Sequence, residues 1–181
     1  YLGVLGAKNQ NQEIRSGLTA LFSFSGHETF PFRYAWLKKG VDAISQDPSV
    51  FSDDRAMIKL GVGKNMVRSI RHWCFATRLV AEDTNLPSNR GRYLAPTELG
   101  KMIFTEGGFD PYLEDPATLW LIHWQIAANP QKSTTWYWAF SYWNLGEFTK
   151  DMLLRGLQEF VEKSGWKAVS PNSLKRDIDC F

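Results

Sequence analysis

The sequence predicts a mostly α-helical protein with a small β wing, and three observations support this fold class. First, apolar residues recur at the helical spacing of three and four positions over several stretches. Second, only two short segments, residues 79–82 and 92–95, have the character of strands. Third, a turn at Gly61–Gly63 separates a short helix from a longer, basic one. This order predicts a winged helix-turn-helix followed by a helical, Trp-rich second unit.

Length and composition narrow the class of protein. The chain has 181 residues, enough for one large domain or two small ones with an apolar core. Its net charge of +2 and pI near 8.5 are too mild to indicate a partner. It contains no run of eighteen apolar residues and no visible signal peptide, so we expect no membrane partner. Cys74 and Cys180 lie far apart, which favours reduced thiols in a cytoplasmic protein.

The N-terminal part is expected to lead into the first helix. Residues 1–24 mix small and polar residues with weak periodicity, which predicts a leader or an extended arm, and Tyr1 is not expected to be the natural start. A winged helix-turn-helix DNA-binding domain is expected over residues 25–105. Pro31 is predicted to open its first helix, because the first helical position needs no amide donor. The apolar face of that helix consists of Tyr34, Leu37, Val41 and Ile44.

A short helix and a tight turn follow. Ser52 is a candidate N-cap, because its hydroxyl can accept a hydrogen bond from the first turn of a helix. Ala56, Met57 and Leu60 form an apolar stripe. Gly61 can adopt the left-handed conformation that ends a helix. We therefore expect a short helix, a glycine turn and then a longer helix.

The longer helix lies within Lys59–Val80 and has two chemically different faces. At about 100° per residue, its apolar residues gather on one side; they are Met66, Val67, Ile70, Trp73 and Cys74. The opposite side carries the candidate DNA-binding residues Lys64, Asn65, Arg68, Ser69, Arg71 and His72. Arginine and asparagine suit the edges of guanine and adenine, and lysine suits phosphate. A solvated surface face is the alternative interpretation.

The predicted wing strengthens the DNA-binding interpretation. It consists of a strand, a polar turn, a return strand and a closing helix, at residues 79–82, 83–91, 92–95 and 96–104. Arg90 and Arg92 lie near its tip and are further candidates for DNA contact. From Arg55 to Arg92, eight Lys or Arg residues stand against two acids, on a chain whose net charge is only +2. This concentration of positive charge favours double-stranded DNA as a partner.

A nucleotide-binding loop is excluded. Gly61-Val-Gly-Lys64 resembles the end of a phosphate-binding loop, which requires a glycine five residues before Gly63. Ile58 occupies that position, and Asn65 stands where a Ser or Thr should hold the metal.

Two groups of residues are candidates for chemistry. Asp110, Glu114 and Asp115 lie within six residues, and carboxylates can hold Mg²⁺ for phosphodiester hydrolysis. His27 and Glu28 can ligate a metal, but no second His follows four residues on, as in zinc proteases. Helix capping is the alternative in both cases, and Asp115 precedes a proline, as at many helix starts. The catalytic candidates are Asp110, Glu114, His27 and Glu28, with Mg²⁺ as cofactor if the protein cuts DNA.

A helical domain is expected over residues 106–181. Its helices are predicted at residues 117–128, at residues 147–162 and from residue 170 onward. Residues 133–145 are dense in aromatic side chains but contain almost no Lys or Arg, which favours a core role over a platform for unpaired bases. The last helical pattern is still in phase at Phe181, so we expect the natural chain to continue.

Four stretches, residues 24–34, 60–70, 110–120 and 172–177, resemble a bacterial family long labelled only as a domain of unknown function. The most specific is Leu60-Gly-Val-Gly-Lys-Asn-Met-Val-Arg-Ser-Ile70, and the resemblance spans roughly residues 24–181. The better-known members are SspB-type proteins of DNA phosphorothioation defence systems. The resemblance implies work beside a cysteine desulfurase, a sulfur-activating enzyme and an ATPase. It also implies DNA nicking at the site where sulfur replaces a phosphate oxygen.

Together these observations predict a DNA-binding component of a bacterial phosphorothioate modification and anti-phage defence system, either its nicking protein or the DNA-binding part of it. Two alternatives stay open: a winged-helix transcriptional regulator without chemistry, and a protein-interaction adaptor that docks through its aromatic half. Relaxation of supercoiled plasmid with Mg²⁺ separates the nickase from the regulator. Salt-dependent DNA binding separates both from the adaptor.

Overall fold

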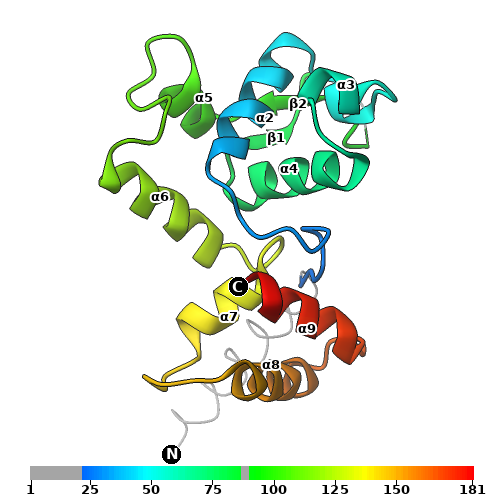
Figure 1. The fold of residues 1–181 in the computed structure, drawn as a ribbon, viewed down its shortest axis with the longest axis vertical. Coiled ribbons are helices and arrows are strands. Elements are labelled where there is room, and N and C mark those ends of the chain that lie inside the picture. Colours follow the sequence, from blue (N-terminus) through cyan, green and yellow to red (C-terminus); the bar gives the residue numbers. More distant parts are fainter. Residues whose placement is uncertain (1–21, 87–89) are drawn as a thin grey trace, which may run out of the picture.

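A computed structural model describes residues 22–86 and 90–181. Most of the expected leader, residues 1–21, and the turn residues 87–89 lie outside the described residues. Helices dominate the described part, with one two-stranded antiparallel sheet (Figure 1). The elements in chain order are α2 (Ala35–Gln46), a 3₁₀ turn (Val50–Ser52), α3 (Ala56–Leu60), α4 (Lys64–Ala76), β1 (Val80–Glu82), β2 (Leu94–Pro96), α5 (Glu98–Phe104), α6 (Pro116–Ala127), α7 (Thr134–Ser141), α8 (Lys150–Ser164) and α9 (Pro171–Cys180).

Several helix ends follow the capping rules read from the sequence. Asp115 accepts a hydrogen bond from the Ala117 amide at 2.8 Å, which confirms it as the cap of α6. Ser170 caps α9 by accepting from the Ser173 amide. Gly61 ends α3 with a φ of 64°, the left-handed conformation that a glycine adopts without strain.

Two predicted helix starts are wrong. The first helix begins at Ala35 and not at Pro31, because residues 25–30 form a turn of their own in which Phe30 donates to the His27 carbonyl. Ser52 does not cap α3; its hydroxyl donates instead to the Arg92 carbonyl at 3.2 Å. The turn before α3 is stabilised by Asp53, which accepts from the Arg55 amide.

Helix α4 packs its predicted apolar face into the core. Val67, Ile70, Trp73 and Cys74 are buried. Gly40 of α2 lies directly against Cys74 and Ile70, so a side chain at position 40 would displace one of them. This close approach fixes α2 across the inner face of α4 and leaves the other face of α4 to the surface.

The short sheet follows α4 and is tied to its surroundings by backbone hydrogen bonds. Its strands pair in the register Val80↔Pro96, Ala81↔Ala95 and Glu82↔Leu94. The Leu94 amide donates to the Pro48 carbonyl, and Thr97 then caps α5. Gly100 of α5 lies against the Leu79 backbone, where a Cβ atom would overlap the carbonyl oxygen. The hairpin is therefore held close to the C-terminal end of α4.

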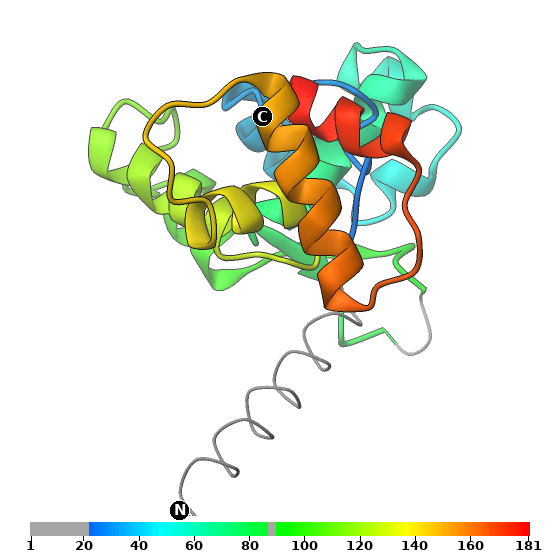
Figure 2. The same ribbon diagram turned by 90° about the horizontal axis from the view of Figure 1, so that it is seen from below.

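Two large clusters make up most of the apolar interior, and a smaller third one, Ala56, Leu60 and Val67, joins α3 to α4. The first surrounds Trp73 and joins α2, α4, the hairpin and α5 to Ile122, Ile126 and Trp136. The second joins Trp138 of α7 to the inner faces of α8 and α9. In Figure 1, α6 runs between the upper group of elements and the lower group α7–α9, and the view in Figure 2 shows α8 and α9 side by side. Within the described ranges, no helix combines the length and apolar character that crossing a membrane requires.

Candidate nucleic-acid interface

The outer face of α4 carries an open row of residues one helical turn apart. Lys64, Asn65 and Arg68 are exposed, whereas Arg71 and Phe75 are partly buried further along the helix. Lys64 forms no ion pair with any carboxylate of residues 22–86 or 90–181. We call Lys64, Arg68, Arg71 and Phe75 the α4 stripe, since steps of three or four residues place them along one line.

Arg68 is paired with an acid across the chain. Its Nη1 atom lies 3.4 Å from Glu28 Oε1, and the two side chains are 55% and 34% exposed. Glu28 and Thr29 both have positive φ angles, of 52° and 64°, so the turn presents Glu28 in an uncommon backbone conformation. Glu28 thus lies at the edge of the α4 stripe as a surface partner of Arg68.

Ser69 and His72, predicted for DNA contact, are wholly or largely covered by neighbouring residues. Ser69 is fully buried, and Gly26 lies directly against the His72 imidazole. Ser69 Oγ and His72 Nε2 are buried atoms without a hydrogen-bond partner among the described residues. Burial, with smaller contributions from His27 and Lys132, lowers the pKa of His72 from 6.5 to about 3. His72 is therefore neutral, and it is partly exposed, whereas Ser69 is buried.

Arg71 lies between α4 and the hairpin. Its guanidinium carbon is 4.9 Å from the centre of the Phe75 ring, and its Nη2 donates to the Gly91 carbonyl at 3.3 Å. Burial lowers the pKa of Arg71, while the neighbouring carboxylate of Glu82 opposes that shift. Arg90 and Arg92 are exposed beside it, and Arg92 lies 5.8 Å from the Tyr93 ring.

Lys59 and Arg78, two of the eight basic residues between Arg55 and Arg92, have structural roles. Lys59 forms 2.7 Å ion pairs with both Asp47 and Asp53, and its hydrogen bond lowers the pKa of Asp47 to about 2. Arg78 donates to the Ala128 carbonyl at 2.7 Å and thereby ties α4 to the end of α6. Their charges are therefore partly or wholly engaged within the protein.

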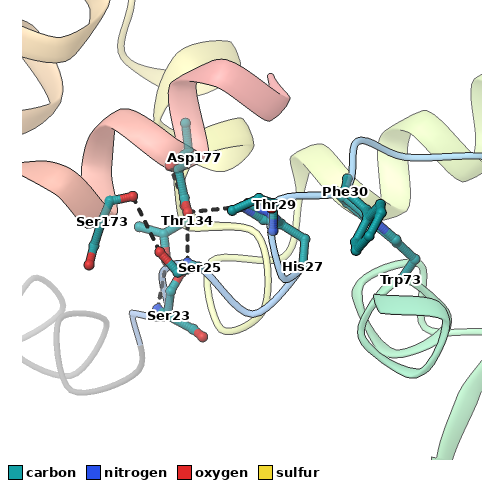
Figure 3. Close-up of polar contacts among 10 residues, drawn as sticks. Ser23, Ser25, His27, Thr29, Phe30, Trp73, Thr134, Ser173 and Asp177 are labelled. Atoms are coloured by element: carbon teal, nitrogen blue, oxygen red, sulfur yellow. Dashed lines mark hydrogen bonds and ion pairs between the residues drawn. The ribbon is translucent and has the colours of Figure 1, made fainter. Parts of the chain in front are cut away.

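His27 belongs to a buried polar junction and not to a surface site. Its Nε2 lies 3.0 Å from Asp177 Oδ1, and its Nδ1 accepts from the Thr29 amide at 3.2 Å (Figure 3). Asp177 also accepts from the Ser25 amide and from the Thr135 hydroxyl. We call His27, Ser25, Thr135 and Asp177 the polar junction. Both ring nitrogens of His27 therefore have partners within the protein, and the residue is buried.

The polar junction also supports α4 from behind. The His27 ring stacks on Trp73 at 5.9 Å with an interplanar angle of 16°. Trp73 Nε1 donates to the Phe30 carbonyl at 3.2 Å, in the same loop (Figure 3). The loop that carries His27 and Glu28 is therefore attached to α9 on one side and to α4 on the other.

Two of the acids at residues 110–115 stabilise the start of α6: Asp115 caps the helix, and Asp110 holds the turn before it. Asp110 is buried and accepts hydrogen bonds from the Glu114 and Asp115 amides at 2.9 and 3.1 Å. Its carboxylate oxygens therefore hold the turn before α6. Within the described ranges, no group of three or more His, Cys, Asp or Glu side chains is placed to hold a metal ion. Asp110 is thus engaged within the turn, whereas the Glu114 side chain is exposed.

The aromatic half is only partly core. Trp136 and Trp138 are buried, as predicted, but Trp120 and Trp124 of α6 are 71% and 70% exposed. They border a groove of about 540 Å³ between α6 and α7, beside which His123 packs edge-on against Phe140 at 4.6 Å. Exposed aromatic area of this kind is typical of a surface that contacts another molecule.

Comparison with known proteins gives the family. Residues 24–181 match the family described as "Protein of unknown function (DUF4007)". The chain belongs to this family. A search of curated proteins gives no match.

Two solved crystal structures are also similar to this chain. The crystal structure of magnesium-ion-bound SspB is 33% identical with a TM-score of 0.80, covering 90% of this chain and 49% of SspB. A second SspB crystal structure is 34% identical with a TM-score of 0.77, covering 87% of this chain and 48% of SspB. The chain is thus an SspB-type member of the family and spans about half the length of these relatives.

Proposed function

We propose that the protein is a DNA-binding component of a bacterial phosphorothioate modification and anti-phage defence system. The observation that carries this proposal is the α4 stripe with its exposed cations, in a chain whose fold is similar to that of SspB. In this proposal α3, the glycine turn and α4 act as a helix-turn-helix, and the β1–β2 hairpin acts as its wing. Residues 25–105 form that unit, and residues 106–181 support it.

Each exposed side chain has a role in this proposal. Arg68 and Asn65 reach base edges in the major groove, because guanidinium and amide groups match guanine and adenine. Lys64, in the first turn of α4, contacts phosphate. Arg90 and Arg92 contact the backbone beside the groove. Ser69 has no direct role because it is buried, and His72 has none because its ring is neutral and largely covered.

The nicking reaction implied by the resemblance to SspB-type proteins is proposed for the whole system and not for a site on this chain. Mg²⁺ is bound in one SspB structure. The described residues of this chain do not fit such an ion, because Asp110 holds the turn before α6 and no cluster of three ligands occurs among them. We therefore assign DNA binding and positioning to residues 22–181, with the ATPase and the sulfur-activating enzyme as expected partners.

Duplex binding at several salt concentrations tests the proposal. The wild-type protein should bind a short duplex with an affinity that falls linearly with log salt. Lys64→Ala and Arg68→Ala should each weaken binding, and Lys64→Ala should reduce the salt slope by about one unit. Lys163→Ala is the matched control, because Lys163 is exposed and paired with Glu159 on α8. Equal affinity in all four proteins would overturn the assignment of α4 as the recognition helix.

The exposed aromatic groove supports a second candidate function, a protein-interaction adaptor. Trp120 and Trp124 offer apolar area without a neighbouring cluster of cations. The same titration separates the two candidates. An adaptor without a DNA-binding role would show no salt-dependent affinity for the duplex.

A further inference from the structure

The α4 stripe continues onto a residue that lies far away in the sequence. Lys132, in the turn between α6 and α7, has its Nζ atom 5.5 Å from the centre of the Phe75 ring. Arg71 lies 4.9 Å from the same ring. Phe75 therefore has two cations close to its ring, one from α4 and one from the second half of the chain.

The turn that carries Lys132 is attached to the end of α4 at several points. Asn129 Nδ2 donates to the Ala76 carbonyl at 3.0 Å and lies within 3.3 Å of the Phe75 carbonyl. Arg78 donates to the Ala128 carbonyl at 2.7 Å. Inside the turn, Ser133 Oγ donates to the Ile126 carbonyl at 2.7 Å. These bonds fix the position of the turn relative to α4, so Lys132 has a defined place beside the stripe.

The charge of Lys132 is available to an external anion. Its side chain is exposed, and it forms no ion pair with a carboxylate in the part of the chain that the structure describes. It borders a hollow of about 510 Å³ between the turn and β1, which Phe75 and Arg78 also line. A lysine ammonium binds phosphate as a point charge and needs no particular base.

We propose that Lys132 binds the phosphodiester backbone of double-stranded DNA, which makes the α6–α7 turn part of the nucleic-acid interface. This inference rests on the proposed function, since it requires that the α4 stripe contacts DNA. It adds a contact from residues 106–181, to which the proposed function otherwise gives a supporting role. The DNA would then lie along Lys64, Arg68, Arg71 and Lys132 in that order.

Duplex titrations of charge variants test the inference. Lys132→Ala should weaken binding at low salt and reduce the salt slope by about 0.9 unit, the value for one phosphate contact. Between about 50 and 200 mM salt, wild type should lose affinity by some factor, and the factor for Lys132→Ala should be about three to four times smaller. Lys132→Arg should retain the wild-type slope, because the positive charge is kept. Lys167→Ala is the matched control, since Lys167 is exposed and lies between α8 and α9, with its Nζ atom 6.0 Å from the Trp166 ring.

The outcomes separate this inference from the proposed function. If Lys64→Ala and Arg68→Ala weaken binding while Lys132→Ala behaves like Lys167→Ala, the turn is not part of the interface and the function stands. If the wild-type protein shows no salt-dependent binding, both proposals fail. Equal thermal unfolding midpoints of wild type and the Lys132 variants would show that the exposed side chain at position 132 affects DNA binding and does not affect folding.

Discussion

At the residue scale, position around α4 decides which polar side chains reach solvent. Lys64, Arg68 and Arg71 lie within about 40° of one line on the helix, whereas Ser69 and His72 lie about 80° to 140° away from it. The turn at residues 25–29 covers that flank, and Gly26 contacts His72. A helical projection predicts which side of α4 is polar and which is apolar. It does not show that another segment of the chain, here the turn at residues 25–29, packs against the side that carries His72.

Glu28 gives a prediction about DNA affinity. Glu28→Gln should raise affinity for a duplex, because the change frees Arg68 from its ion pair and removes a negative charge that repels phosphate. Glu159→Gln is the control, since it removes an exposed acidic partner of a cation on α8. Fluorescence anisotropy at low salt measures both. Unchanged or weaker binding by Glu28→Gln, relative to the control, would mean that Glu28 does not limit Arg68.

His72 gives a prediction about pH. Its pKa is about 3 in the folded protein and near 6.5 when unfolded, so between these values the unfolded state binds one more proton. Stability should therefore fall as the pH decreases from about 6.5, by up to about 1.4 kcal/mol per pH unit from this group. Urea unfolding across that range measures the slope. His72→Phe, which cannot titrate, should have a flatter profile, and an unaltered profile would contradict this account.

At the element scale, the sequence correctly predicted helix ends that are set by contacts within a few residues. The caps Asp115 and Ser170 and the left-handed Gly61 are set by hydrogen bonds within a few residues. Pro31 failed as a helix start because the preceding turn is held by a residue about 150 positions away, Asp177. Exposure of Trp120 and Trp124 was likewise not predictable, since it depends on which helices pack against α6.

At the scale of the whole molecule, the polar junction connects the two large apolar clusters. Asp177 of α9 belongs to the C-terminal helices, while His27 stacks on Trp73 in the first cluster. The loop between them also supports Glu28 beside the α4 stripe. The arrangement of α4 and its neighbours therefore depends on a helix that lies about 100 residues further along the chain.

Asp177→Ala tests this connection. The substitution leaves His27 Nε2, the Ser25 amide and the Thr135 hydroxyl without their shared acceptor in a buried site. At about 1–3 kcal/mol for each unsatisfied group, it should lower the free energy of unfolding by at least about 3 kcal/mol. Asp179→Ala, which breaks only the exposed ion pair with Lys150, should cost less than about 1 kcal/mol. Similar urea midpoints for the two variants would show that the junction is not a major support.

The sequence by itself determined the order of the elements, the buried face of α4 and the concentration of cations around it. These features follow from the helical period and from turn residues, which act over a few positions. Only the tertiary structure decided that Ser69 and His72 are covered, that His27 is bound to Asp177, and that Lys132 extends the α4 stripe. Each of these depends on contacts between residues more than 40 positions apart, and no local pattern encodes such contacts.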